Sequence, residues 1–503
     1  MAEAVLARAA RWSWPWRAAF CGGVGALSAL GQAPWGLWPL TIFGMAVFYG
    51  LYRQAQGWRA AAALGWLVGT GHFLLALHWI TEPFMVDAAR HGWMAPFALL
   101  GLAAGMALYW GAALALARVM GGGAAAFVAG VGLAELARGW LFTGFPWAQA
   151  GHALIDTPLL HWSSYLGAPG LLVLVLGSGV ALWHAVAGRR GNGALALVGL
   201  AALWPLGAAL TPEAGAGAGA PVVRLIQPNA PQHEKWDHAK VQLFFDRQRA
   251  FTAAGDVPDL VVWPETAVPV WLENAGETLE AVAASARGAP VVLGIQRSEG
   301  RRIFNSLAMI EAGGTVSEIY DKHHLVPFGE FMPLGDFLGS LGIYGLASND
   351  GQGYSAGPGA RLLDLGPLGR ALPLICYESV FSRDLRAAPG RADMILLITN
   401  DAWFGKVSGP YQHLAQARLR SAEMGLPMIR VANTGVSAMI DATGKITESI
   451  PLGEAGWRDA ALPPPLPETV YARLGDAPML VFYGALLAMS LWRNRRRARA
   501  VRD

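Results

Sequence analysis

The chain has 503 residues, of which 54% are hydrophobic and only 15% charged. Soluble globular domains average about 25% charged residues, so this composition favours a membrane protein over an ordinary soluble one. The two cysteines, Cys21 and Cys376, exclude a disulfide framework. The formal net charge is only +3, yet the segment RNRRRARAVR (493–502) is strongly basic. An apolar run directly precedes this segment, which favours an anchor facing anionic lipid over a nucleic-acid-binding tail.

Apolar runs of nearly bilayer-spanning length dominate residues 14–210. Each has close to the roughly 17–25 residues with which a helix crosses a bilayer. We predict transmembrane helices at 14–31, 37–53, 59–81, 92–119, 122–141, 168–187 and 193–210, and an eighth at 477–492. The first run can alternatively be a cleaved signal peptide, because Arg8, Arg11 and Arg17 precede an apolar core.

The distribution of arginine predicts the orientation of these helices. Cytoplasmic loops of membrane proteins carry an excess of Lys and Arg. If the N-terminus is cytoplasmic, the basic tail and most arginines beside the spans are also cytoplasmic, whereas the short outside loops hold only Arg90. Arg138, near the outer end of the fifth helix, is a mild exception. Seven crossings then place residues 211–473 outside the cytoplasm, which in a bacterium means the periplasm, with the helices in the inner membrane.

Residues between the seventh and eighth helices have a different composition. EAGAGAGA (213–220) indicates a flexible linker, and PPPLP (463–467) indicates an extended return to the membrane. Between them we predict strands at 222–227, 259–263, 290–295, 305–310, 371–376, 392–398, 428–433 and 436–441, and helices at 237–254, 273–287, 379–388 and 410–425. Continuous apolar strands that alternate with helices predict a layered α/β domain whose sheets are covered on both faces.

The predicted domain organisation follows from these boundaries. We expect a seven-helix transmembrane bundle over 1–212, a linker over 213–221 and a periplasmic α/β domain over 222–462. Residues 463–503 then form the return segment, the eighth helix and the basic cytoplasmic tail.

Three stretches stand out because each places a reactive group just after an apolar strand. LVVWPET supplies Glu265, YDKHHLVPFGE supplies Lys322 and Glu330, and ALPLICYE supplies Cys376. Loops at strand ends build active sites in layered α/β domains. A thiol is a poor nucleophile until a base takes its proton, and a nearby ammonium stabilises the thiolate and a later oxyanion. The alternative is that Cys376 is a small buried hydrophobe, as free cysteines often are.

The surroundings of Cys376 add to this interpretation. The helix predicted over SVFSRDLRAA (379–388) follows the cysteine, and a helix N-terminus favours negative charge. The backbone N–H of Tyr377 is therefore a candidate second oxyanion donor. An unpaired cysteine in an oxidising compartment is also a liability, which favours a reactive role when Glu265 and Lys322 occupy comparable strand ends.

These motifs resemble those of the nitrilase superfamily. WPET, YDKHHLVPFGE, ICYE and LLITNDAWFG carry the likeness, and that superfamily has a Glu–Lys–Cys triad on an αββα sandwich. With seven helices before the domain and one after it, the chain resembles the membrane-embedded branch, the apolipoprotein N-acyltransferase family. RGWLFTGFPW (138–147) and IQPNAPQHEKWD (226–237) extend this resemblance over nearly the full length.

The resemblance implies a role for each matching residue. Glu265 is the expected general base, Lys322 the oxyanion and thiolate stabiliser, and Cys376 the nucleophile. Residues that match supporting or oxyanion positions are Glu330, Tyr377 and Glu378, and those expected on the substrate side are Trp236, Trp403, Phe404 and Trp147. Trp403 and Phe404 can equally pack in the core, and Trp147 can belong to an aromatic belt at the membrane interface instead of lining a lipid opening.

The resemblance also implies a two-step acyl transfer. Cys376 attacks a membrane phospholipid ester and becomes a thioester, and the amine of a diacylglyceryl-cysteine apolipoprotein then takes the acyl group. We expect no cofactor, no metal and no nucleic acid, and a monomer. Loops at 326–335, 341–346 and 401–406 are expected to cover the loaded site and to move.

Two other functions remain open from the sequence. A membrane-tethered amidase of the same superfamily would use the same triad and pass the acyl group to water. A transporter with an external domain would need ionisable groups and broken helices within its spans, and the apolar runs show few of the first and no evident pair of the second. Glu135 and Arg138 share one helix face and are expected to pair structurally.

Overall fold

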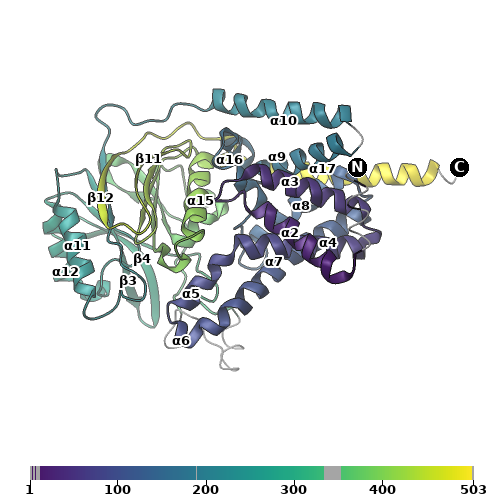
Figure 1. Ribbon diagram of the computed structural model, residues 1–503. Helices are drawn as coiled ribbons and strands as arrows, with labels where there is room; N and C mark the ends of the chain where they lie inside the picture. Colours follow the sequence, from purple (N-terminus) through teal and green to yellow (C-terminus); the bar gives the residue numbers. More distant parts are fainter. Residues whose placement is uncertain (1–2, 4–5, 7–11, 188–189, 334–352, 501–503) are drawn as a thin grey trace. The chain divides into compact units, whose positions relative to one another are not determined.

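A computed structural model describes residues 3, 6, 12–187, 190–333 and 353–500 (Figure 1). The chain divides into two compact units. The helical unit comprises Met1–Thr211 and Thr469–Asp503, and the sandwich unit comprises Pro212–Glu468.

The helical unit is built from long apolar helices with short helices between them. The long helices are α2 (Trp14–Ala29), α3 (Trp38–Gln54), α4 (Gly57–Ala76), α7 (Ala95–Val119), α8 (Gly123–Trp140), α9 (Ser163–Val186), α10 (Arg190–Leu210) and α17 (Ala477–Ala500). The short ones are η1 (His78–Thr81), α5 (Glu82–Met85), α6 (Ala88–His91), η2 (Gly92–Met94), η3 (Ala150–Leu154), η4 (Pro158–Trp162) and α16 (Val470–Leu474). A helix therefore lies on every apolar run that the sequence predicted to be helical.

Three of these helices differ most from the predicted ranges. The run at 59–81 is not one helix, because α4 ends at Ala76 and the chain turns by 63° into His78–Met85. α9 begins five residues earlier than predicted, and Gly167, with φ +64°, together with Pro169 bends its first turns. α17 continues beyond 492 through the basic tail, since arginine is a good helix former.

Length and apolarity test the predicted crossings only in part. Within the described residues, three helices meet both criteria for a membrane span, namely Ala88–Val119, Pro158–Val186 and Arg190–Leu210, and the bent pair Gly57–Ala76 with His78–Met85 makes up to four. α2 and α3 have 16 and 17 residues, fewer than the roughly 20 that cross a bilayer without help. Several helices can thus span a membrane, and the count of eight is not confirmed.

Glu135 and Arg138 form the ion pair that the sequence predicted on α8. Both side chains are buried. Trp110 Nε1 donates to Glu135 Oε1 at 2.6 Å, and Arg138 donates to the backbone carbonyls of Phe145 and Trp147. Because unsatisfied charge is costly among apolar helices, this cluster ties the loop after α8 to the helix and leaves the pair with a structural role.

The sandwich unit contains two six-stranded sheets. The first has the order β12-β1-β2-β3-β4-β5 and the second the order β11-β10-β9-β8-β7-β6. Their strands are β1 (Val222–Gln227), β2 (Leu260–Val262), β3 (Val291–Glu299), β4 (Arg302–Ile310), β5 (Val316–Asp321), β6 (Leu363–Asp364), β7 (Arg370–Ile375), β8 (Met394–Thr399), β9 (Met428–Ala432), β10 (Ser437–Ile440), β11 (Ile446–Ile450) and β12 (Gly456–Ala461).

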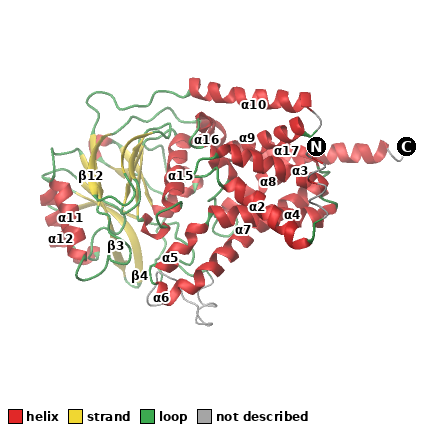
Figure 2. Ribbon diagram, in the orientation of Figure 1, coloured by secondary structure: helices red, strands yellow, loops and turns green. Residues whose placement is uncertain are grey.

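Helices cover both outer faces of this pair of sheets. Figure 2 shows the strands between α11 (Val241–Ala253) and α12 (Gly276–Ala286) on one side and α15 (Gly409–Met424) on the other. A further short helix is α14 (Ser382–Arg386), and short 3-10 segments are η5 (Leu272–Asn274), η6 (Gly366–Leu368), η7 (Cys376–Val380) and η8 (Asp401–Phe404). The predicted layered α/β sandwich is confirmed.

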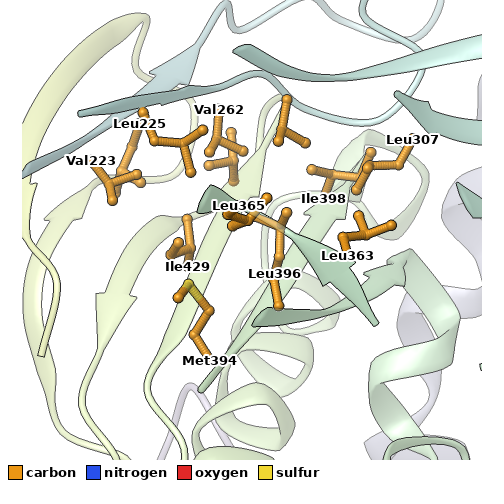
Figure 3. Close-up of a cluster of buried hydrophobic side chains, with 14 of the residues drawn as sticks. Val223, Leu225, Val262, Leu307, Leu363, Leu365, Met394, Leu396, Ile398 and Ile429 are labelled. Carbon is orange, nitrogen blue, oxygen red and sulfur yellow. The ribbon is translucent and has the colours of Figure 1, made fainter. Parts of the chain in front are cut away.

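The core of the sandwich lies between the two sheets. Leu225 and Val262 from the first sheet meet Leu396, Ile398 and Ile429 from the second in one buried cluster (Figure 3). A separate apolar cluster joins the outer face of the first sheet to α11 and α12. Strands buried on both faces are apolar throughout, which is why the central strands were predictable.

The strands missing from the prediction lie toward the sheet edges. β5, β11 and β12 carry the sequences VSEIYD, ITESI and GWRDAA, in which polar residues alternate with apolar ones. β5 and β12 are the edge strands of one sheet, and β11 is an edge strand of the other, whose second edge is β6, a two-residue strand that the sequence also did not predict. An edge strand packs on fewer neighbours and tolerates polar residues, so it lacks the apolar run that marks a central strand.

Candidate active site

Three strand ends of the sandwich unit bring together the groups that the sequence singled out. Glu265 follows β2 and Lys322 follows β5, both in the first sheet, whereas Cys376 follows β7 in the second. Lys322 Nζ lies 3.8 Å from Glu265 Oε1 and 2.8 Å from Glu330 Oε1. The charges of Glu265 and Lys322 both act on the Cys376 thiol. All three side chains are buried, at 6%, 1% and 6% exposure, so their charges interact with little screening.

Burial and the neighbouring charges set the protonation of these groups. Burial raises the pKa of Cys376 well above its usual value, and the carboxylate of Glu265 raises it further while Lys322 opposes both. Burial alone would lower the pKa of Lys322, but Glu330 and Glu265 outweigh it and raise that pKa. The resting site therefore holds a neutral thiol beside a charged ammonium, and a nearby base would be needed to make the thiol a nucleophile.

Glu265 has the position and the raised pKa of such a base. Burial raises the pKa of Glu265, and the charge of Lys322 opposes this effect without cancelling it. The backbone of the WPET turn is fixed by β3, because Gly294 N donates to Pro264 O at 3.2 Å. A Cβ at Gly294 would lie 2.4 Å from Thr266 N, so only glycine allows the turn to approach the strand this closely.

Asn305 joins the two carboxylates of the site and was missed by the sequence analysis. Its Nδ2 donates to Glu265 Oε1 at 2.6 Å and to Glu330 Oε1 at 3.3 Å. Its backbone oxygen accepts a hydrogen bond from Lys322 N at 2.9 Å. One residue of β4 therefore orients Glu265, Glu330 and Lys322. The only sequence signal was a polar residue amid the buried apolar positions of a central strand.

Replacing Asn305 with leucine should slow the loading of an acyl group onto Cys376 by about 10- to 100-fold, since a hydrogen bond to a charged group contributes roughly 1.5–3 kcal/mol. The bond from Asn305 lowers the pKa of Glu265, so its loss should raise that pKa and move the pH profile of loading upward. Intact-mass kinetics at several pH values measure both effects.

Ser306 offers a matched control for this experiment. It is the next residue in β4, fully buried, and it donates to Asp321 Oδ1 at 2.7 Å. Ser306→Ala should cost stability without moving the pH profile. An Asn305→Leu protein with the wild-type profile would contradict the positioning role of Asn305.

Lys235 is a second buried ammonium beside the site. Its Nζ donates to Glu265 O at 3.1 Å and to Thr266 Oγ1 at 2.8 Å, and burial lowers its pKa to about 8 against the opposing charge of Glu265. Thr266 has φ +46°, a conformation that is uncommon outside glycine. Lys235 therefore stabilises the backbone turn that carries Glu265.

Glu330 and Glu378 both support the site, but in different ways. Glu330 holds Lys322, and its Oε2 accepts from Val326 N at 2.8 Å. Glu378 accepts from Ile375 N at 2.7 Å, from His323 N at 2.8 Å and from the Tyr320 hydroxyl at 2.9 Å. Its carboxylate ties the segment after β5 to the end of β7, so Glu378 positions the two strand ends and is no oxyanion donor.

The backbone at Cys376 differs from the predicted helix start. Cys376 has φ +53° and begins the 3-10 turn η7, and the α-helix expected over 379–388 is only the five-residue α14. The predicted helix over 379–388 is therefore wrong in extent, and a helix of five residues offers less macrodipole than the predicted one. The ring of Tyr377 packs on Phe381 with 4.9 Å between centroids, and the side chain of Tyr377 is buried.

The predicted substrate-side aromatics fall into two groups. Trp236 is 44% exposed beside Lys235, and Trp403 is half-buried in η8. Phe404 packs against the core cluster between the sheets. Trp147 lies in the helical unit, where it is fully buried against Trp79. Of these four, Trp236 therefore presents the largest surface to a substrate, and Trp147 has a packing role.

Two of the predicted covering loops extend beyond the described residues. The loop predicted at 341–346 lies entirely outside them, and the loop at 326–335 is described up to residue 333. Phe328 in the latter is 56% exposed. Within the described part of the chain, no group of three His, Cys, Asp or Glu side chains is arranged to hold a metal.

Comparison with protein families divides the chain at the same place as its composition. Residues 223–469 match the family described as carbon-nitrogen hydrolase. Residues 24–181 match the apolipoprotein N-acyltransferase N-terminal domain. The amidase of Nesterenkonia sp. AN1, among solved structures, aligns with a TM-score of 0.37 at 18% identity over 50% of this chain and 94% of its own.

Curated relatives cover almost the whole chain. The apolipoprotein N-acyltransferase of Rhodopseudomonas palustris is 35% identical and covers 96% of both chains. That of Bradyrhizobium diazoefficiens is 36% identical over 95% of both, and that of Rhizobium rhizogenes is 39% identical over 80% of both. The helical unit and the sandwich unit thus occur together in these relatives. The chain belongs to the apolipoprotein N-acyltransferase family, on a sandwich of the nitrilase type.

Proposed function

We propose that this acyltransferase of lipoprotein maturation moves a fatty acyl chain from a membrane phospholipid to the N-terminal amine of a diacylglyceryl-cysteine apolipoprotein, through a thioester on Cys376. The observation that carries the proposal is the convergence of a buried thiol, a carboxylate and an ammonium at three strand ends. The family match over 96% of the chain supplies the substrate class.

Each group has one task in the first half-reaction. Glu265 takes the proton of Cys376, and the sulfur attacks the ester carbonyl of the phospholipid. Lys322 stabilises first the thiolate and then the oxyanion of the tetrahedral intermediate. The pair with Glu330 keeps Lys322 charged, so the lysine acts as an electrostatic group and not as a proton donor. The lysophospholipid leaves with the proton that Glu265 held.

The second half-reaction reuses the same base. The α-amine of the apolipoprotein attacks the thioester and must lose a proton as it does so. Glu265, again a carboxylate, accepts that proton and returns it to the sulfur as the thiol leaves. Dividing one hard transfer into two easier ones predicts ping-pong kinetics. One chain supplies all of these groups, so the chemistry needs no second copy.

The helical unit gives this reaction its location. Both substrates carry acyl chains embedded in a bilayer, and helices that can cross a membrane hold the sandwich at that surface. We propose that the chain crosses the inner membrane eight times, with the sandwich over 222–462 in the periplasm, because the arginines gather beside the opposite ends of the spans. The exposed aromatic residues Trp236 and Phe328 are suited to contact lipid there.

Stepwise loading and discharge test the proposed function. Incubation with phospholipid should add one hydroxylamine-labile acyl mass to the chain, measured by intact-mass spectrometry. A diacylated lipopeptide should then remove that mass and gain an amide. A lipopeptide with a blocked α-amine should leave the adduct in place. Release of free fatty acid as the main product in the presence of the unblocked lipopeptide would instead identify a hydrolase.

A further inference from the structure

A closed ring of hydrogen bonds starts at the Cys376 side chain and returns to its own carbonyl. A side-chain hydrogen bond joins the thiol to Thr399, and Thr399 Oγ1 donates to Asp401 Oδ1 at 2.8 Å. Asp401 Oδ1 lies 2.8 Å from His413 Nδ1, and His413 Nε2 lies 2.8 Å from Ser379 Oγ. Ser379 Oγ is 2.9 Å from Cys376 O. Thr399 is the member of this ring that is hydrogen-bonded to the sulfur, whereas Glu265 and Lys322 act on the sulfur through their charges.

Strand pairing brings Thr399 to the sulfur. β7 and β8 are parallel neighbours, with Ile375 paired to Ile398. Thr399 is the last residue of β8 and Cys376 directly follows β7, so both lie at the carboxyl edge of the sheet, where the thiol is hydrogen-bonded to Thr399. Thr399 is fully buried. The motif LLITNDAWFG therefore supplies Thr399, whose hydroxyl contacts the thiol, in addition to its aromatic side chains.

Asp401 accepts hydrogen bonds from more than one side, which fixes the orientation of this ring. Arg430 Nη2 donates to Asp401 Oδ2 at 2.5 Å, and both side chains are buried. Although burial opposes ionisation, Arg430 and His413 hold the pKa of Asp401 at about 2. Burial and the charge of Arg430 lower the pKa of His413, so this histidine is neutral at pH 7. Asp401 thus remains a carboxylate and accepts bonds from neighbouring donors.

The hydroxyl of Thr399 carries one proton, and this limits what it can do at each stage. While it donates to Asp401, its lone pairs face the sulfur and can accept the S–H of the resting thiol. When the thiol has lost its proton, the sulfur can only accept, so the hydroxyl must turn to it. Asp401 retains the donors from His413 and Arg430 throughout, and no buried carboxylate is left without a partner.

We propose that the Thr399 hydroxyl is a hydrogen-bond switch for the nucleophile: it accepts from the Cys376 thiol at rest and donates to the sulfur once Glu265 has removed the proton. The S–H bond breaks and an O–H bond forms on the Glu265 carboxylate, while Thr399 keeps its own proton. Asp401 and His413 are positioning residues that act through Thr399. This inference rests on the proposed role of Cys376 as nucleophile.

The charges around the sulfur explain why such a donor matters. Glu265 and Asp401 both disfavour the thiolate, and Lys322 favours it. Thr399 is bonded to both Asp401 and the sulfur, so removing its hydroxyl leaves the sulfur facing that negative charge without a donor. The thiolate is then less stable, and its formation should need a higher pH.

Two matched pairs of variants isolate the hydroxyl from packing. The first pair is the native threonine and Thr399→Val, whose side chains have the same size. The second pair is Thr399→Ser and Thr399→Ala, which both lack the methyl group and leave a similar void. Within each pair only the hydroxyl differs, so either pair decides the question if one variant fails to fold. A Cys21→Ala background leaves Cys376 as the only thiol, because the chain has two cysteines.

The readout is the rate of Cys376 alkylation by iodoacetamide against pH, followed by intact mass on the full-length protein in detergent. Alkylation follows the thiolate fraction. In Thr399→Val and Thr399→Ala the midpoint should rise by about 1 pH unit or more relative to the hydroxyl-bearing partner, with alkylation about 10-fold slower on the rising limb. Equal midpoints within both pairs would overturn the inference.

Acyl loading of the same proteins from phospholipid separates this inference from the proposed function. If loading shows the same shift within each pair, both proposals are supported. If alkylation shifts but even the parent fails to load an acyl group, the proposed function fails and the role of Thr399 stands. If the parent loads normally and the hydroxyl changes neither profile, only the role of Thr399 fails.

Discussion

Replacing Cys376 with alanine should abolish acyl loading from phospholipid, with a loss of roughly 10⁶-fold, the scale seen when a covalent enzyme loses its nucleophile. No other thiol can substitute, because the remaining cysteine, Cys21, lies in α2 of the helical unit. The hydroxylamine-labile mass seen on the wild-type chain should be absent from the variant. The same variant should also fail to acylate a diacylated lipopeptide.

Cys21 supplies the matched control for this variant. It too is a buried free cysteine, at 8% exposure, so Cys21→Ala makes an equivalent change in packing within the helical unit. We expect Cys21→Ala to load and transfer as the wild type does. An acyl adduct that persists in Cys376→Ala would show that another residue is the nucleophile.

Replacing Glu265 with glutamine should slow loading by about 10²- to 10⁴-fold, the usual contribution of a general base. The amide keeps the size of the side chain and its bond to Asn305 but cannot take the thiol proton. Since burial raises the pKa of Glu265, wild-type loading should increase as the pH rises through that raised value, where the carboxylate forms. Glu265→Gln should lose this increase, measured by single-turnover intact-mass kinetics at several pH values.

Glu318→Gln is a suitable control for the loss of a carboxylate. Glu318 lies in β5, the strand that ends beside Lys322, and it pairs with Arg361 outside the site at 2.5 Å. Its replacement should leave both the rate and the pH profile unchanged. If Glu265→Gln loaded at the wild-type rate with the wild-type profile, the proton would have to leave Cys376 by another route.

The central strands of the sandwich could be predicted from the sequence because each carries an apolar run. β1, β7 and β8 are buried along almost their whole length, and strands covered on both faces must be apolar. The edge strands β5 and β12 lack this pattern. Which strands pair, and in which sheet, depends on contacts between residues far apart in sequence, which no local pattern contains.

The candidate site, like the sheets, could be predicted from the sequence only in part. Glu265, Lys322 and Cys376 each follow a strand in a recognisable motif, so the sequence named them. Asn305 and Lys235 contact the same site from β4 and from the segment after β1, without any chemistry that marks them in the sequence. Their roles follow from the atoms they reach, Glu265 Oε1 and Glu265 O, at 2.6 and 3.1 Å.

The sequence by itself determined the class of this protein: apolar helices that can enter a membrane, a layered α/β domain, and a thiol, a carboxylate and an ammonium at strand ends. These features depend on composition and local periodicity, and both can be read from the sequence of an unfolded chain. Only the tertiary structure decided that β7 and β8 lie side by side, so that Thr399 meets the sulfur of Cys376. It also decided that Glu378 accepts hydrogen bonds from both strand ends. The helix after Cys376 proved to be only five residues long. Hydrogen bonds and burial depend on distances in space, and those distances are set by how the sheets pack.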